Sequence, residues 1–271
     1  MVRNEGDPLR AALVCPPAQE YTRVEDTVRQ NFVEVPDAAA AADQHAELRR
    51  ALARAGASVV EVPEFAGHPN SVFVRDVALA TPRGFVRLRM GLPAREGEER
   101  WLSEHLHVLG FPEVGAIEPP GTLEGGDVFL LGDLALVGVS KRANANGATQ
   151  LARLLTPMGY TVRATDIRPP ALHLGSVLSP VGPRRVVCVD GTLSTGFLDG
   201  LDVIRAPRDR PDTTANVLCL RENVVLADAH ESPATLDALG KGGVTVHVLD
   251  LAEFGKGSGG PTCLVLPLGR G

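Results

Sequence analysis

The sequence predicts an α/β fold in which one mixed unit of strands and a helix recurs five times. Short valine-rich runs of strand length alternate along the chain with segments of helical composition, most of which end near a glycine. A single unit of this kind cannot bury its own apolar face, so the repeats are expected to associate radially or to stack. A dinucleotide-binding sheet is the alternative, but no Gly-x-Gly-x-x-Gly motif follows the first predicted strand.

The first repeat begins with a strand at 11–15, which a long loop separates from the first helix. Asp37 is the expected N-cap of that helix, because its side chain can accept a hydrogen bond from a free backbone N–H of the first turn. The residues up to Ala55, rich in Ala, Leu and Arg, favour a helix that Gly56 can end. A second strand is expected at 58–62.

The other four repeats follow the same order of strand, helix and strand. The second is expected at 85–89, 96–109 and 114–117, and the third at 134–139, a helix up to 158, and 160–163. The fourth is expected at 185–190, a helical turn at 197–201, and 203–205; the fifth at 223–227, a helix opening at Ser232-Pro233, and 244–249. Five further strands are expected between the repeats, at 71–80, 127–131, 177–178, 215–220 and 264–268.

The bulk composition fits a single domain spanning residues 1–271 and excludes several classes of function. Hydrophobic residues make up 44% of the chain and charged residues 22%, which is ordinary for a globular protein with a full core. A net charge of −6 argues against nucleic acid and against an anionic membrane surface, and it favours a cationic small ligand. No apolar run reaches the roughly 18 residues needed to span a bilayer, and the first residues lack the apolar segment of a signal peptide. The four cysteines form no Cys-x-x-Cys pair, which suits a reducing cytoplasm.

Four polar residues stand out because each lies just before or within one of the strands between the repeats. They are Asp76, Glu124, His173 and Cys263. If the repeats surround a common axis, these segments converge on it and the four side chains share one pocket. A glycine-rich approach delivers Cys263 to the mouth of an apolar strand, where a thiol can act as a nucleophile. Each residue alone has a structural alternative: a buried core cysteine or histidine, a turn carboxylate, or a surface ion pair of Asp76 with Arg75.

These segments resemble the guanidine-modifying enzymes, the superfamily of dimethylarginine dimethylaminohydrolase, arginine deiminase and the amidinotransferases. The resemblance covers nearly the whole chain and implies the pentein fold, an α/β propeller of five ββαβ modules around a central active site. The matching positions are Asn70, Phe73 and Asp76 in Asn-Ser-Val-Phe-Val-Arg-Asp, Arg95, Glu124 in Leu-Glu-Gly-Gly-Asp, Arg142, His173 in Leu-His-Leu, and Cys263 in Gly-Gly-Pro-Thr-Cys.

The resemblance also implies a role for each of these residues. Cys263 would attack the guanidinium carbon, His173 would protonate the departing amine and then activate water, and Glu124 would orient His173. Asp76, with Phe73 and Asn70, would bind the cationic guanidino substrate, and Arg95 and Arg142 would hold its α-carboxylate. The products would be citrulline and an amine or ammonia, and the long loop at 16–33 resembles a lid. No cofactor and no metal are expected, because His105 and His107 lie two apart at a helix end and cannot face one ion.

Two departures from the family's patterns leave the substrate open between methylated arginine and arginine. Asn70 and Arg75 resemble arginine deiminases, since dimethylarginine hydrolases tend to carry acids at both positions. Gly175, two residues after His173, lacks the aspartate of the deiminases, so a less polar wall suited to a methyl group is expected there. The expectation is therefore a hydrolase that prefers N-methylated arginine. Arginine deiminase, an amidinotransferase and a non-catalytic binding protein on the same fold are the alternatives, and the sequence does not decide between a monomer and a homodimer.

Overall fold

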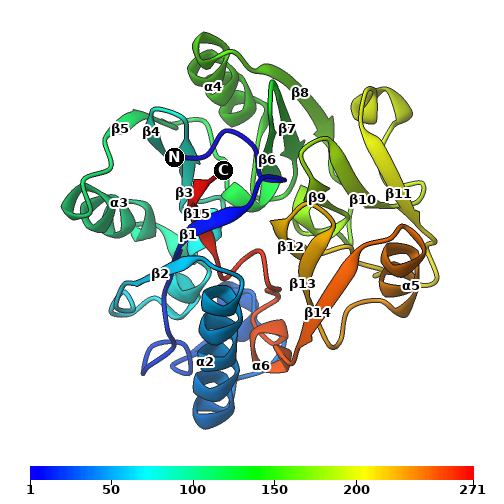
Figure 1. Ribbon diagram of the computed structural model, residues 1–271. Helices are drawn as coiled ribbons and strands as arrows, with labels where there is room; N and C mark the ends of the chain where they lie inside the picture. The colour runs from blue at the N-terminus through cyan, green and yellow to red at the C-terminus, as the bar shows by residue number, and fades with distance from the viewer.

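The structure, a computed structural model, describes residues 1–271 apart from the side chain of Thr195. Its strands form five three-stranded sheets that lie like blades around a common axis, with helices on the outside of the ring (Figure 1). In every sheet the middle strand is antiparallel to one neighbour and parallel to the other. This architecture confirms the predicted α/β propeller of five modules.

Each sheet consists of an inner strand, a middle strand and an outer strand. The first is β15 (Leu266–Arg270), β1 (Leu9–Val14) and β2 (Ser58–Glu61), and the second is β3 (Ala78–Thr81), β4 (Gly84–Arg87) and β5 (Glu113–Ala116). The third is β6 (Val128–Leu131), β7 (Leu134–Val139) and β8 (Thr161–Asp166), and the fourth is β9 (Leu178–Gly182), β10 (Arg185–Val189) and β11 (Asp202–Ala206). The fifth is β12 (Val217–Arg221), β13 (Val224–Asp228) and β14 (Thr245–Leu249).

One helical segment joins the middle and outer strands of each sheet, as the order of the repeats predicts. These segments are α2 (Ala38–Arg54), α3 (Glu98–Val108), α4 (Ala145–Leu155), the short turn η7 (Thr195–Leu198) and α5 (Pro233–Lys241). Asp37 caps α2 as expected, because its side chain accepts a hydrogen bond of 2.8 Å from the backbone N–H of Ala40. Two short helices lie in loops, α1 (Thr27–Gln30) between β1 and α2 and α6 (Ala252–Gly255) between β14 and β15.

The ring of sheets closes where the last strand, β15, pairs with the first strand, β1. β15 runs antiparallel to β1, so residues from the two ends of the sequence share one sheet. The strand expected at 264–268, which follows the fifth repeat in the sequence, therefore corresponds to β15 and completes the first sheet. This pairing carries the segment before β15 to the centre of the molecule (Figure 1).

Two predicted strands differ from the observed ones for identifiable reasons. Most of the strand expected at 71–80 is instead a pair of tight turns, η1 (Pro69–Val72) and η2 (Val74–Asp76), and only β3 is extended. These turns curl the backbone toward the axis before the strand begins. The strand expected at 177–178 is longer, since β9 continues through Pro180. Proline is tolerated there because β9 lies at the edge of its sheet.

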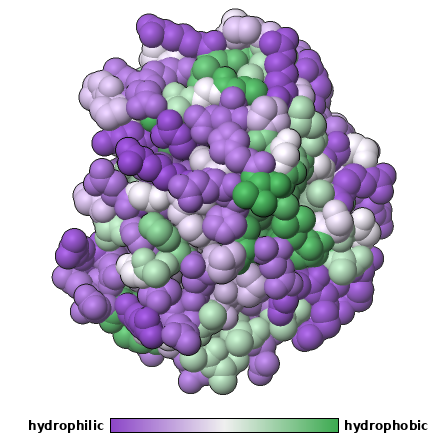
Figure 2. All heavy atoms as spheres, turned by 90° about the vertical axis from the view of Figure 1, so that its left-hand side faces the viewer, coloured by the Kyte–Doolittle hydropathy of each residue, from purple (hydrophilic) through white to green (hydrophobic). Residues whose placement is uncertain are grey.

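Apolar side chains fill the spaces between the blades and the helices outside them, in three buried clusters. On the face shown in Figure 2 hydrophilic residues dominate, and apolar areas are limited in extent. Val108 and Leu109, at the end of α3, are among the large apolar side chains that remain exposed. None of the helices that the structure describes combines the length and apolar character required to cross a bilayer.

Candidate active site

Four segments that lead into inner strands meet at the axis of the ring. Asp76 ends η2 before β3, and Glu124 directly precedes η4 (Gly125–Asp127) before β6. His173 directly precedes η6 (Leu174–Ser176) before β9, and Cys263 lies in a turn before β15. The convergence expected from the sequence is therefore present, and each of the four side chains comes from a different sheet.

These segments surround a small cavity of about 20 Å³. Seven of the eight residues expected in the site line it, and Glu124, which is fully buried, lies behind them. The seven are Asn70, Phe73, Asp76, Arg95, Arg142, His173 and Cys263. Such a volume holds about one water molecule, so the walls are drawn together more closely than an amino-acid ligand requires.

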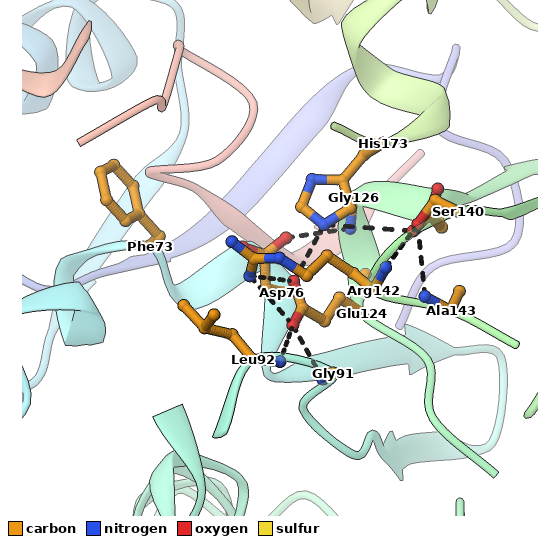
Figure 3. Close-up of polar contacts among 12 residues, drawn as sticks. Phe73, Asp76, Gly91, Leu92, Glu124, Gly126, Ser140, Arg142, Ala143 and His173 are labelled. Carbon is orange, nitrogen blue, oxygen red and sulfur yellow. Dashed lines mark hydrogen bonds and ion pairs between the residues drawn. The ribbon is translucent and has the colours of Figure 1, made fainter. Parts of the chain in front are cut away.

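Glu124 connects the histidine to one of the arginines. Its Oε2 lies 2.9 Å from Nε2 of His173 and 3.1 Å from Nη1 of Arg142 (Figure 3). Its Oε1 also accepts a hydrogen bond of 2.9 Å from the backbone N–H of Gly91. Burial opposes ionisation of this carboxyl, but the hydrogen bond with His173 and the charge of Arg142 outweigh it and lower the pKa of Glu124. Glu124 is therefore an anion that fixes the imidazole ring.

His173 is held between carboxylates, which favour its protonated form. Burial alone would lower its pKa, but Asp76, Asp127 and Glu124 together raise the pKa of His173 to about 9. Asp127 Oδ2 lies 4.0 Å from His173 Nε2, and Asp127 Oδ1 accepts a hydrogen bond of 2.8 Å from the N–H of Leu174. Burial raises the pKa of Asp127 to about 6. Asp127 was not among the expected site residues, although the Glu-Gly-Gly-Asp pattern was the signal for it.

Asp76 lines the cavity and is engaged by Arg95. Nη1 of Arg95 lies 2.6 Å from Asp76 Oδ2, and the N–H of Gly126 donates to Oδ1 at 3.1 Å. Arg95 also binds Glu98 through Nε at 2.8 Å and the backbone oxygen of Phe73 through Nη2 at 3.0 Å. All three nitrogens of Arg95 are thus directed at the protein. The buried partner Glu98 was not anticipated, because nothing in its local sequence marks it as polar core.

The alternative of a surface ion pair between Arg75 and Asp76 is wrong. Arg75 is buried and turns away from the cavity toward Glu5, which it binds through two contacts of 2.5 and 2.8 Å. It also donates to the backbone oxygens of Gly125 and Val128. Arg75 therefore lies behind the wall of the cavity and does not contact a bound substrate, so its identity does not distinguish between the candidate substrates.

Cys263 is the one cysteine that reaches the cavity. Its backbone N–H donates 3.0 Å to Gly260 O, which closes the turn that carries it. Burial and the negative charge of Asp76 raise the pKa of the Cys263 thiol, so the sulfur is protonated when no cation is bound. Cys188 and Cys219 are buried inside strands, and burial raises their thiol pKa values to about 11. Both thiols therefore belong to the packed core.

Asn70 and Phe73 line the cavity on the side of the long loop. Asn70 Nδ2 donates 3.0 Å to the backbone oxygen of Gln30, whereas its buried Oδ1 has no partner among the described atoms. The ring of Phe73 packs so closely on Gly259 that a Cβ there would lie 2.1 Å from it. Only glycine permits that approach.

The long loop also contributes directly to the wall of the cavity through Asn31. Its tip is fastened to the cysteine segment, because Ser258 Oγ donates 3.3 Å to Asn31 O and the N–H of Val33 donates 2.6 Å to Lys256 O. Asn31 and Ser258 both have positive φ, 59° and 62°, so the two strained residues face each other at the edge of the cavity. The position of the loop fits the lid expected from the resemblance.

Asp76, Glu124 and His173 lie close enough together to hold a metal ion. Their polar atoms are already engaged with one another or with Arg95 and Arg142, so they do not form a free set of ligands around one point. The arrangement instead suits a planar organic cation, with a carboxylate to bind it, a thiol beside it and an imidazolium to protonate a leaving group.

The chain matches the family model described as arginine deiminase over residues 64–194 and 198–270. It is 29% identical over 241 residues to N(G),N(G)-dimethylarginine dimethylaminohydrolase of Pseudomonas aeruginosa, an alignment that covers 89% of this chain and 93% of that protein. A protein of the same name from Streptomyces coelicolor is 32% identical over 222 residues, covering 80% of this chain and 82% of the relative. The solved structure of a P. aeruginosa enzyme mutant complexed with citrulline matches with a TM-score of 0.83 at 27% identity, covering 96% of this chain and 99% of that one.

Proposed function

Because this chain belongs to the arginine deiminase family of guanidino-modifying hydrolases, we propose that it is a cysteine-dependent hydrolase of an arginine-like guanidine, with N-methylated arginine as its preferred substrate. One observation carries the proposal. A thiol, a carboxylate and an imidazolium line the same small cavity, and a buried glutamate lies 2.9 Å from the imidazolium. These are the groups that hydrolysis of a guanidinium requires.

The reaction begins when the substrate binds and places its positive charge beside Cys263. The bound guanidinium favours loss of the thiol proton to solvent, and the thiolate forms a C–S bond with the guanidinium carbon. His173, protonated at neutral pH, gives its proton to the departing nitrogen as the C–N bond breaks, which leaves an S-alkylthiouronium. His173 then takes a proton from water, which attacks the same carbon. The C–S bond breaks and the remaining hydroxyl proton passes to solvent, so that citrulline and the thiolate are released.

Recognition divides between the two ends of the substrate. Asp76 and the unpartnered Oδ1 of Asn70 supply acceptors for the guanidinium N–H groups. For the α-carboxylate, Arg142 is better placed than Arg95. In the part of the chain that the structure describes, Arg142 uses only Nη1 in side-chain hydrogen bonds, whereas Arg95 spends all three nitrogens on Asp76, Glu98 and backbone oxygens. Arg95 therefore chiefly holds Asp76 in place.

The proposed preference for methylated arginine does not follow from Gly175. That residue is buried against Gly126 and Phe129 and is absent from the wall of the cavity, so the expectation of an open wall at this position is wrong. The preference is supported instead by the two relatives named dimethylarginine dimethylaminohydrolase. Arginine deiminase is the second candidate, because Asn70 rather than an acid lies at the cavity.

A competition experiment tests the substrate directly. The enzyme is given equal concentrations of N-methylated arginine and arginine, and citrulline, methylamine or dimethylamine, and ammonia are quantified. Release of the methylated amine in excess supports the proposal, while ammonia in excess assigns the enzyme as an arginine deiminase. If the guanidine is consumed without citrulline being formed, and only when glycine or ornithine is present, the enzyme is an amidinotransferase. No product under any condition contradicts catalysis altogether, with Cys263→Ser as the inactive control.

Arginine and its decarboxylated analogue agmatine test the carboxylate assignment. Arg142→Ala should raise KM for the amino-acid substrate far more than for agmatine, because only the amino acid has a carboxylate that Arg142 can bind. Arg95→Ala should weaken both substrates, since it releases Asp76. Equal losses for both substrates in Arg142→Ala would contradict its proposed role.

A further inference from the structure

In four of the five modules, the segment before the inner strand carries one of the site residues Asp76, Glu124, His173 and Cys263. The corresponding segment of the remaining module also places a polar side chain at the centre. The residue directly before β12 is Asn216. Its Nδ2 lies 3.8 Å from Sγ of Cys263, within hydrogen-bond distance for sulfur. Among the described side chains, it is the one that directs an N–H at the sulfur. The topology thus places one polar side chain from the segment before each of the five inner strands at the same centre.

The orientation of the Asn216 amide is fixed by its neighbours. Its Oδ1 accepts a hydrogen bond of 3.2 Å from the backbone N–H of Thr262 and another of 2.7 Å from the Thr262 hydroxyl. A backbone N–H can only donate, so the atom that faces it must be the amide oxygen. The amide nitrogen, with its two protons, is therefore the atom that faces Cys263.

The Asn216 backbone is anchored as well. Its N–H donates 2.9 Å to Oε2 of Glu231, a buried carboxyl whose other oxygen accepts from the N–H of Ser232 at 2.7 Å. On the other side, Gly260 packs so closely that a Cβ there would lie 2.9 Å from the amide carbon of Asn216. The donor is thus held rigidly between β12 and the turn that carries the cysteine.

The electrostatics of the site explain why a neutral donor is useful here. A thiolate must form beside Asp76, which opposes negative charge on the sulfur. A lysine or arginine next to the sulfur would stabilise the thiolate but would also repel the cationic substrate. An amide N–H stabilises the anion through a hydrogen bond that strengthens as charge develops, and it leaves the charge balance toward the guanidinium unchanged.

We propose that Asn216 is a further catalytic residue, whose amide N–H donates a hydrogen bond to Cys263 Sγ and stabilises the thiolate before and during attack. The inference rests on the proposed function in taking Cys263 as the nucleophile. Thr262 acts through Asn216 as a positioning residue, because its two donors keep the amide from turning over.

The test measures the thiol itself rather than turnover. The rate at which iodoacetamide alkylates Cys263 is followed by mass spectrometry of the Cys263 peptide as a function of pH, without substrate. Asn216→Ala should raise the apparent pKa of alkylation by about one unit, a tenfold loss of thiolate at a given pH below it. Asn216→Asp keeps the shape but points a carboxylate at the sulfur, so its increase should be larger. In both variants kcat should fall by about tenfold or more while KM changes little.

Asn144→Ala is the matched control, because Asn144 also makes side-chain hydrogen bonds but caps α4, as acceptor from the N–H of Gly147 at 2.9 Å. It should lower thermal stability without moving the alkylation profile. If Asn216→Ala does not fold, the near-isosteric Asn216→Asp still decides the question. An unchanged alkylation pKa in the folded variants overturns the proposal. Full activity in Cys263→Ser would instead overturn the proposed function, and the alkylation data would remain independent of that result.

Discussion

The ion pair between Arg75 and Glu5 gives a sharp test of how the centre of the ring is held together. Arg75 Nη1 and Nη2 contact the Glu5 carboxylate at 2.5 and 2.8 Å, and both side chains are about 5% exposed or less. Arg75 also ties together two of the segments that carry catalytic residues. Its Nε donates to Gly125 O at 3.2 Å, and its backbone N–H donates to Cys263 O at 3.2 Å.

Glu5→Gln removes the negative charge but leaves the shape of the side chain. The guanidinium of Arg75 then stays buried without a counterion, which costs about 3–5 kcal/mol of unfolding free energy in such pairs. That is a large part of the roughly 5–15 kcal/mol that stabilises a typical domain. Because Arg75 contacts the segments of Glu124 and Cys263, we also expect kcat to fall, although Glu5 does not touch the cavity.

Urea unfolding of four variants measures this cost: Glu5→Gln, Arg75→Met, the two combined, and a control. The matched control is Asp133→Asn, which breaks a pair of the same chemistry with Arg184 at 2.6 Å, but with side chains 69% and 52% exposed. Exposed pairs contribute about 0–1 kcal/mol, so this variant should be nearly as stable as the parent. Replacing both partners, in Glu5→Gln with Arg75→Met, should cost less than the two single changes added together. Equal stability of Glu5→Gln and Asp133→Asn would refute the reasoning.

Other predictions concern the catalytic groups and one buried histidine. His173→Ala should lower kcat by about 10²- to 10⁴-fold, measured by citrulline release, and a rate equal to the parent would show that His173 is only a core residue. Cys263→Ser should abolish turnover, whereas Cys188→Ala should change melting temperature more than rate. In the free enzyme the pKa of the Cys263 thiol is raised above its ordinary value and that of His173 is about 9, so kcat/KM should rise with pH from neutrality to about 9 as thiolate forms, and should level off there because His173 begins to lose its proton. Burial lowers the pKa of His45 from 6.5 to about 3, and neither ring nitrogen has a partner among the described atoms. Between those pH values only the unfolded chain binds the proton, so stability is lost as pH falls below about 6.5; His45→Leu should flatten that dependence in thermal unfolding at pH 4.5 and 7.5.

Local sequence patterns were sufficient for most of the repeating elements. The strand predicted at 134–139 coincides with β7, and Asp37 caps α2 where the residue type and the following alanines indicated. Short-range hydrogen bonds and side-chain periodicity decide such features, and both are visible in a window of a few residues. The residues that line the cavity were recognised for a different reason, since their short motifs resemble those of a known superfamily.

Long-range pairing decided the rest. Nothing near Arg75 in the sequence indicates that it binds Glu5, and nothing near Arg95 indicates that Glu98 and Asp76 occupy all its nitrogens. β15 closes the first sheet because its backbone finds β1 from the far end of the chain. A buried charge must find a partner, and a strand edge must find a neighbour, wherever in the sequence they lie. The sequence by itself therefore determined the repeating unit and the chemical groups, whereas the tertiary structure decided which charges pair, and it was this that brought Asn216 to the sulfur of Cys263.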